Sequence, residues 1–374
     1  MGDLADVFDG THQTPEYVDK GINFISVENI DTLIPNKFVT KDFYNKNYKN
    51  KFPEKGDVFL TRIGDVGTPR LIDKNGDMAY YVTLALLKPK NIDSSFLVSN
   101  IQSSYVQNEL WRKTLHIAFP KKINLGDINK VTTKVPSINE QNKIGIFFNL
   151  IDSLITLHKR KSSQLKLLKK EMIKNSMTLT SLYPILRFSG FNDEWEISKI
   201  EDSFKERKNR NASGRLLSVT IDDGVVPTSS LDRIVNTSED KSNYKSVFKN
   251  DLVYNSMRMW QGASGISKLD GIVSPAYTVV TPIDNTLTDY FSYYFKRNDL
   301  IYKFRTHSQG LTSDTWTLRY IPFSEIKIRK PKTIEEQLKI FNFIKSMDDM
   351  LLINKNKIKL LNDIKKLYLD NLFI

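Results

Sequence analysis

The sequence predicts an α+β protein with two globular α/β domains in tandem, each followed by a long helix. The two helices are expected to pair as an antiparallel coiled coil, which gives the chain pseudo-two-fold symmetry. Three observations predict this fold. The 374 residues exceed one ordinary domain. Residues 138–177 match residues 334–373 without a gap, at an offset of 196. The segments that precede these two stretches resemble each other more weakly.

The repeated segment reads as one long helix in both copies. It holds 13 identities in 40 positions, no internal Pro, and a single Gly at Gly145. Capping boxes start both copies, with Ser137 and Glu140 in the first and Thr333 and Glu336 in the second. Apolar residues recur at heptad spacing and predict a paired seam. The predicted seam residues are Ile144, Phe147, Ile151, Leu154, Leu165, Leu168, Ile340, Phe343, Met347, Met350, Leu361 and Ile364.

Polar residues interrupt this seam at the same place in both helices. His158 and Lys161 interrupt the first copy, and Asn354 and Lys357 interrupt the second. In an antiparallel pair these positions meet near the middle, where a polar layer fixes register. About 40 residues at 1.5 Å each give a rod of roughly 60 Å, which is the length of a spacer.

The globular segments share an order of elements. Each contains a Gly-containing turn, a β-rich stretch, an amphipathic helical stretch and a last strand. The β-rich stretches are residues 78–87 and 272–281, the helical stretches 96–111 and 290–304, and the last strands 128–135 and 325–329. The chain therefore divides into domain 1 (1–136), a spacer helix (137–177), a linker (178–191), domain 2 (192–332) and a second spacer helix (333–374).

Composition excludes several classes of protein. With 40% hydrophobic and 26% charged residues the chain is folded, and no Cys is present for a disulfide, a thiolate metal site or a Cys nucleophile. No apolar run reaches the length of a membrane span, and the first residues carry no signal-peptide pattern. We expect a soluble, cytoplasmic protein.

No catalytic constellation stands out. The chain lacks a P-loop, an H-E-x-x-H helix and a G-x-G-x-x-G turn, and its four His are dispersed. The stretch Ser274-Pro-Ala-Tyr277 resembles the loop that orients a base amine in amino-methyltransferases, but Ala replaces its second Pro. We expect no catalytic residue and no metal site in this chain. A self-sufficient DNA methyltransferase or nuclease remains the alternative.

Four loops combine Arg, aromatic and small polar residues in a way that suits DNA. Arg addresses guanine, Gln addresses adenine, Thr contacts thymine methyls, and Gly lets the backbone approach phosphates. The alternative is structural: the Arg residues are ordinary surface cations, and the Trp residues are partly buried anchors. The candidate DNA-binding residues are Thr11, His12, Thr14, Tyr17, Arg62, Thr68, Arg70, Arg258, Trp260, Gln261, Ser264, His307, Gln309, Thr312 and Trp316.

The whole chain resembles the specificity (HsdS) subunits of type I restriction-modification systems. The resemblance lies in Gly10-Thr-His-Gln-Thr-Pro15, Thr61-Arg-Ile-Gly-Asp-Val-Gly67, Val253-Tyr-Asn-Ser-Met-Arg-Met-Trp-Gln-Gly262, Gly271-Ile-Val-Ser-Pro-Ala-Tyr277 and the Pro-x-x-x-Glu-Gln-x-Lys-Ile starts of both helices. One departure stands out. The second domain opens with Trp195 and a strand leading to Ile200, whereas the first begins directly at Gly2, so its edge strand is in doubt.

This resemblance implies a non-catalytic subunit in which each domain is a target-recognition domain that reads one half of an asymmetric, bipartite site on double-stranded DNA. It implies partners as well: two methyltransferase (M) subunits and restriction motor-nuclease (R) subunits. S-adenosylmethionine, ATP and Mg²⁺ would then belong to those partners, with no cofactor in this chain. A coiled-coil scaffold with protein-binding ends is a further alternative.

The net charge of +12 is unevenly spread. Residues 137–177 carry eight basic and three acidic side chains, whereas domain 1 carries 18 and 16. The expected DNA readers are thus almost neutral. We expect the subunit alone to hold DNA weakly and with steep salt dependence, and the helix lysines to serve protein docking or the DNA between half-sites.

Overall fold

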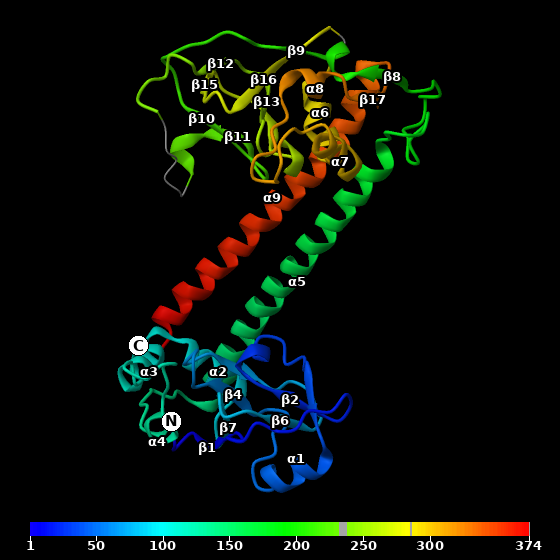
Figure 1. Cartoon of the computed structure of the whole chain (residues 1–374). Helices are drawn as coiled ribbons and strands as arrows, with labels where there is room; N and C mark the ends of the chain where they lie inside the picture. Colours follow the sequence, from blue (N-terminus) through cyan, green and yellow to red (C-terminus); the bar gives the residue numbers. More distant parts are fainter. Residues whose placement is uncertain (232–237, 285, 374) are drawn as a thin grey trace. The chain divides into compact units, whose positions relative to one another are not determined.

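The computed structural model describes residues 1–231, 238–284 and 286–373. The chain folds as two compact units: Met1–Arg160 together with Lys355–Ile374, and Lys161–Asn354. Each unit holds one globular domain and a part of each long helix, α5 (Ile138–Ser176) and α9 (Ile334–Asn371) (Figure 1). No helix in the described part of the chain is long and apolar enough to cross a membrane.

The first unit is built on a four-stranded antiparallel sheet. Its order is β1-β7-β4-β5. A second sheet of three strands has the order β3-β2-β6, with β2 and β6 parallel. The strands are β1 (Ala5–Asp9), β2 (Ile22–Ile25), β3 (Lys37–Val39), β4 (Val58–Thr61), β5 (Pro69–Leu71), β6 (Met78–Tyr80) and β7 (Leu84–Pro89). The helices of this domain are α1 (Lys41–Tyr48), α2 (Ser94–Gln102), α3 (Ser104–Lys113) and α4 (Leu125–Asn129).

The second unit repeats this central sheet. Its order is β9-β16-β13-β14, again antiparallel throughout, so β9, β16, β13 and β14 correspond to β1, β7, β4 and β5. Three strand pairs accompany it: β10-β11, β12-β15 and β8-β17. The strands are β8 (Glu196–Lys199), β9 (Phe204–Glu206), β10 (Leu217–Thr220), β11 (Gly224–Pro227), β12 (Lys245–Val247), β13 (Leu252–Asn255), β14 (Ser264–Ile266), β15 (Gly271–Val273), β16 (Tyr277–Pro282) and β17 (Lys327–Lys330). The helices are α6 (Thr288–Tyr294), α7 (Asn298–Thr306) and α8 (Tyr320–Ser324).

Strand alternation explains why each central sheet is buried on both faces. Val58 and Leu60 of β4 face α2, α3 and the long helices, whereas Phe59 between them faces the aromatic core around Tyr48 and Tyr80. The same division holds in the second unit: Leu252 and Tyr254 face α6 and α7, and Val253 faces the β10, β12 and β15 side. The weak similarity of the two globular segments therefore corresponds to one shared framework.

A buried Gln attaches each long helix to the domain before it. Gln141 Oε1 accepts from the backbone N–H of Asp93 at 3.0 Å, and its Nε2 donates to Pro136 O. Gln337, the same position of the repeat, accepts from Leu287 N–H at 3.0 Å and donates to Pro331 O. Asp93 and Leu287 are the residues that precede α2 and α6. The repeated Glu-Gln therefore serves to join helix and domain.

Within the first unit, α5 and α9 run antiparallel. Asp152 of α5 contacts Lys365 of α9 at 2.7 Å. Phe147, one turn earlier on α5, stacks edge-on against Tyr368, which lies later on α9, with 4.9 Å between ring centroids. The predicted antiparallel pairing is therefore observed in this unit.

The second unit contains the matching contacts. Lys169 of α5 contacts Asp348 of α9 at 2.5 Å, and this pair is the repeat copy of the Asp152 and Lys365 pair. Asn354 is buried and donates from its side-chain amide to Ser162 Oγ at 2.5 Å. The predicted polar interruption at Asn354 is thus part of a polar contact between the helices.

Four of the twelve predicted seam residues are exposed, and at these places the buried or half-buried position is the next residue along the helix. Ile144, Ile151, Leu165, Ile340, Met347 and Leu361 are buried or half-buried, and so are Phe147 and Ile364. Leu154, Leu168, Phe343 and Met350 are exposed, and the next residues, Ile155, Lys169, Ile344 and Leu351, turn inward instead. The reason is that apolar residues stand next to each other in these helices, as in Leu154-Ile155 and Phe343-Ile344, so heptad spacing fits two neighbouring rows of side chains equally well. The row of side chains that packs between the helices includes Lys169 and Lys365. Lysine is usually a surface residue, and here each Lys is half-buried because it pairs with an Asp of the other helix.

The strand predicted at residues 128–135 was wrong. Helix α4 ends at Asn129, and no strand follows it in the described chain before α5. In the second domain the equivalent β17 pairs with β8 from Lys327 to Lys330, which supplies its backbone partners. In the first domain the nitrogen of Met1 donates to Asn129 O and Val131 O. A strand needs a neighbour to complete its hydrogen bonds.

Candidate nucleic-acid interface

In the second domain the candidate residues lie on two loops that touch. The first, loop A2 (residues 255–264), follows β13, and the second, finger F2 (residues 307–317), follows α7. Gln309 and Thr317 pair across the finger through backbone bonds of 3.0 and 2.8 Å. The first residue after the finger, Leu318, donates its backbone N–H to Ser256 O, which fixes finger F2 against loop A2.

Two Trp residues hold the loops together. The rings of Trp260 and Trp316 are edge-to-face with centroids 5.3 Å apart, and the guanidinium of Arg305 lies 5.0 Å from the Trp316 ring. The Trp260 indole N–H donates to Met257 O at 3.0 Å. For these two candidates the geometry favours the structural alternative, since their rings already have partners.

Arg258 is the exposed cation of loop A2. Within the described residues, its guanidinium donates from Nη1 to Gln261 Oε1 at a long 3.5 Å. The turn closes at Gly262, whose φ of +83° is a conformation that favours glycine. Arg258 and Asn255 line two adjacent hollows, of about 470 and 590 Å³. In the part of the chain that the structure describes, the Arg258 guanidinium is therefore available to a ligand.

The walls of these hollows carry both donors and acceptors. The first is lined in part by Ser218, Thr228, Ser274, Tyr277 and Asp314, and the second by Thr220, Asp222, Asp223 and Gln261. A mixture of hydroxyl, amide, carboxylate and guanidinium groups suits base edges better than it suits a purely electrostatic contact with phosphates.

The other candidates of the second domain divide by exposure. Ser264 is buried in β14, with its hydroxyl toward Gly262 O, so it does not reach the surface. His307, Gln309 and Thr312 are exposed on finger F2, and His307 Nδ1 lies 2.8 Å from Lys303 O. Leu311 at the finger tip is fully exposed.

In the first domain, Arg62 is buried and fully engaged. Its Nη1 donates to Asp9 Oδ1 at 2.5 Å and its Nε to Ile123 O at 3.2 Å. Asp9 also contacts His12 Nε2 at 2.6 Å, so the pair anchors the Gly10–Tyr17 loop. The structure favours the structural role for Arg62, because its guanidinium is buried and bonded within the domain.

The remaining first-domain candidates lie around this anchor. Thr11 is buried and pairs with Tyr81 through the backbone. His12, Thr14 and Tyr17 are exposed. Thr68 and Arg70 are half-buried at β5.

The first domain also has a finger, and none of its residues is among the candidates predicted from the sequence. Finger F1 (residues 115–122) lies between α3 and α4, as F2 lies between α7 and α8. Leu115 N–H donates to Lys122 O at 2.7 Å, and Gly64 N–H donates to Lys121 O at 2.8 Å, which ties the finger to the Gly-containing turn. Ile117 and Phe119 at its tip are fully exposed. The position of this segment between two helices, which matches the position of finger F2 in the second domain, is the signal in the sequence that could have identified it.

The two domains thus share the arrangement of their elements but expose different side chains. Each brings a turn after the second central strand against a finger between two helices. In the first domain the exposed groups include Ile117, Phe119 and Lys121, and in the second they include Arg258, Gln309, Thr312 and the apolar Leu311.

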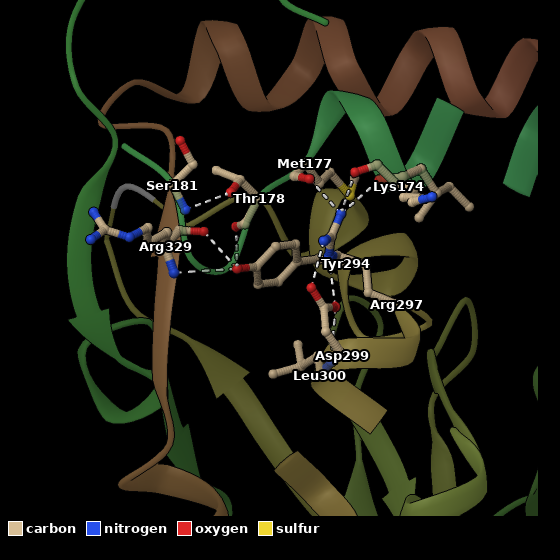
Figure 2. Close-up of polar contacts among 10 residues, drawn as sticks. Lys174, Met177, Thr178, Ser181, Tyr294, Arg297, Asp299, Leu300 and Arg329 are labelled. Atoms are coloured by element: carbon tan, nitrogen blue, oxygen red, sulfur yellow. Dashed lines mark hydrogen bonds and ion pairs between the residues drawn. The ribbon is translucent and has the colours of Figure 1, made fainter. Parts of the chain in front are cut away.

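The second domain is also fixed to the end of α5. Figure 2 shows Arg297 reaching the last turn of this helix, where Nη1 donates to Ile173 O and Lys174 O at 2.9 Å and also to Met177 O. Asp299 orients the guanidinium through two bonds of 2.6 and 3.0 Å. A cation at a helix C-terminus satisfies carbonyls that lack partners within the helix.

A buried hydroxyl supports the same junction. Tyr294 OH donates toward Thr178 O at 3.0 Å and Arg329 O at 2.7 Å, and it accepts from Arg329 N–H (Figure 2). Burial raises the pKa of Tyr294, which keeps the hydroxyl protonated and able to donate. Neither Arg297 nor Tyr294 was singled out from the sequence, because such contacts depend on the docked helix.

The described residues contain no cluster of His, Asp or Glu that could hold a metal ion. The family model for the type I restriction modification DNA specificity domain matches residues 1–167 and again residues 192–363. The chain belongs to this family. It is a specificity subunit of a type I restriction-modification system, and its role is DNA recognition without catalysis. A search of curated proteins gave no match.

Solved structures from type I restriction-modification systems share the fold. The chain is similar to the type I S subunit from M. genitalium, with 15% identity and a TM-score of 0.60 over 100% of this chain and 94% of that one. It is also similar to a chain from a study of complex assembly and conformational transition of the type I R-M system, with 11% identity and a TM-score of 0.54 over 98% and 95%. The HsdS subunit from Thermoanaerobacter tengcongensis matches at 13% identity and a TM-score of 0.49 over 100% and 95%.

Proposed function

We propose that this specificity subunit reads an asymmetric, bipartite site on double-stranded DNA, with one half-site for each globular domain. The observation that carries the proposal is that the two domains have the same central sheet order but expose different side chains on the turn and the finger. Domains with the same sheet order would dock in equivalent ways, while different side chains on the turn and the finger would select different bases.

The long helices set the unread gap between the half-sites in this proposal. One part of each long helix lies in the first unit, and the other part lies in the second. Symmetric readers place half-sites about one helical turn of DNA apart, roughly 34–36 Å. A helical connection suits a fixed gap better than a flexible linker does.

The same helices would dock two methyltransferase subunits, which recruit the motor-nuclease subunits. Support comes from apolar side chains that α5 and α9 leave exposed, since exposed apolar surface marks interaction sites. On α5 these include Ile146, Leu150 and Leu157, and on α9 Leu352, Ile353 and Leu360. S-adenosylmethionine, ATP and Mg²⁺ would be bound by those partners and not by this chain.

Methylation mapping tests the proposal. DNA from cells that produce this chain with its methyltransferase should carry methylated adenines in a two-part sequence whose halves differ and are separated by a constant gap. Methylation or cleavage by the purified chain alone, with Mg²⁺ and S-adenosylmethionine, would contradict it. So would a methylated sequence that is continuous.

A further inference from the structure

A basic groove lies in the second unit between α5 and the start of α7. It has a volume of about 390 Å³. Six of its nine lining residues are cationic and one is acidic. They are Lys166, Lys169, Lys170, Ile173 and Lys174 of α5, and Lys296, Arg297, Asn298 and Asp299.

Three of these cations remain available to a ligand. Asp299, the acidic member, is paired with Arg297, and Lys169 is paired with Asp348. Lys166 and Lys170 are exposed and make no ion pair within the described residues. Lys174 is exposed as well, with Glu171 at a weak 3.9 Å. Lys166, Lys170 and Lys174 are four residues apart, so they follow one face of α5 at intervals of about 6 Å.

Lys296 connects the groove to loop A2. Its ammonium donates to Gly262 O at 2.5 Å, to Ser264 O at 3.1 Å and to Ile221 O at 2.9 Å. Ile221 lines the hollow that Arg258 also lines. The groove therefore ends where the candidate base-reading surface begins. Burial, with nearby Lys169, lowers the pKa of Lys296 to about 8.

We propose that Lys166, Lys170 and Lys174 bind phosphates of the DNA strand next to the half-site read by the second domain. This inference rests on the proposed function. Lysine is a flexible point charge suited to phosphate, and it is depleted from protein interfaces, which favour Arg and aromatic residues. The groove contains no aromatic side chain, and its one Arg is buried. The side chains therefore fit DNA better than a protein partner.

The contact belongs to one half of the site only. The repeat positions on α9 are Asn362, Lys366 and Asp370, where one cation replaces three and an acid is added. Asp370 also accepts a hydrogen bond from Ser104. DNA should therefore be held over a longer stretch beside the half-site of the second domain than beside the other.

The test measures DNA binding by the subunit assembled with its methyltransferase, on a duplex that carries the mapped site and on a scrambled duplex. The triple variant Lys166→Ala/Lys170→Ala/Lys174→Ala is compared with Lys355→Ala/Lys359→Ala/Lys366→Ala, which removes three exposed lysines from α9. A plot of log K for DNA binding against log salt concentration has a negative slope. For the first variant this slope should become less steep by about 2–3, since each lost phosphate contact contributes about 0.9. The α9 variant should keep the wild-type slope, and both should keep the preference for the mapped site.

The outcomes separate the two proposals. Failure of the wild-type assembly to prefer the mapped duplex would overturn the proposed function and this inference with it. An unchanged slope in an α5 variant that still prefers the mapped duplex would overturn the groove inference alone. Loss of methyltransferase binding by that variant, measured by sedimentation, would show that the groove is a protein-docking surface and overturn it too.

Discussion

Arg62 and Arg258 occupy comparable places and have opposite surroundings. Arg62 directly follows β4 and Arg258 lies three residues after β13, each in a turn that contains Gly and leads to the next strand of the chain. Arg62 is buried and held by Asp9 and Ile123, whereas Arg258 is exposed beside two hollows. The same residue type in the same turn of a repeated fold thus stabilises one domain and is available to a ligand in the other.

The largest expected effect tests this contrast directly. Arg62→Ala should lower the free energy of unfolding of the first unit by about 3–5 kcal/mol, because it leaves the partly buried Asp9 carboxylate without its partner. Arg258→Ala should change stability by less than about 0.5 kcal/mol, since its side chain is exposed. Urea denaturation of both variants measures the difference. Equal effects would show that the two residues have similar roles.

The second prediction concerns the two attachment glutamines. Gln337→Ala should destabilise the second unit by about 2 kcal/mol, because Leu287 N–H and Pro331 C=O would lose a buried partner. Gln141→Ala should have a similar effect on the first unit. Gln164→Ala, an exposed position of α5, is the control and should be neutral. Thermal unfolding distinguishes them, and a neutral Gln337→Ala would contradict the role assigned to this residue.

The third and smallest effect is the pH dependence contributed by Lys296. Its pKa in the folded state, about 8, lies below the ordinary value of 10.5, so above pH 8 the unfolded chain holds more protons than the folded one. The wild type should therefore gain a little under about 2 kcal/mol of stability relative to Lys296→Met between pH 7.5 and 9.5. Lys359→Met, on exposed α9 surface, should show no such trend. A constant difference between wild type and Lys296→Met would contradict a desolvated ammonium at this site.

The fold was largely predictable from local patterns. Capping boxes and the absence of Pro located both long helices, and Thr333 Oγ1 does accept from Glu336 N–H. The order of strands and helices followed from the repeat. The predictions that were wrong concern residues whose structure depends on contacts with segments far away in the sequence. Residues 128–135 lack a partner strand, and the row of side chains that packs between the helices includes Lys169 and Lys365, whose Asp partners come from the other helix.

The candidate site was less predictable for the same reason. Sequence composition identified the loops that hold Arg62 and Arg258 but could not tell the buried guanidinium from the exposed one. Finger F1 was missed because Ile117 and Phe119 are apolar, and apolar residues are expected in a core. The residues that fix α5, such as Arg297, are recognisable only once the helix end lies beside them.

The central claim is that two unlike surfaces on one framework each read their own half of the site. Mapping methylated adenines from cells that carry the wild type, Arg258→Ala, or the finger variant Ile117→Ala/Phe119→Ala tests it most directly. Arg258→Ala should relax one half of the sequence by about 10- to 100-fold in preference, and the finger variant should relax the other half alone. Relaxation of the same half by both variants, or an unchanged sequence in both, would contradict the account.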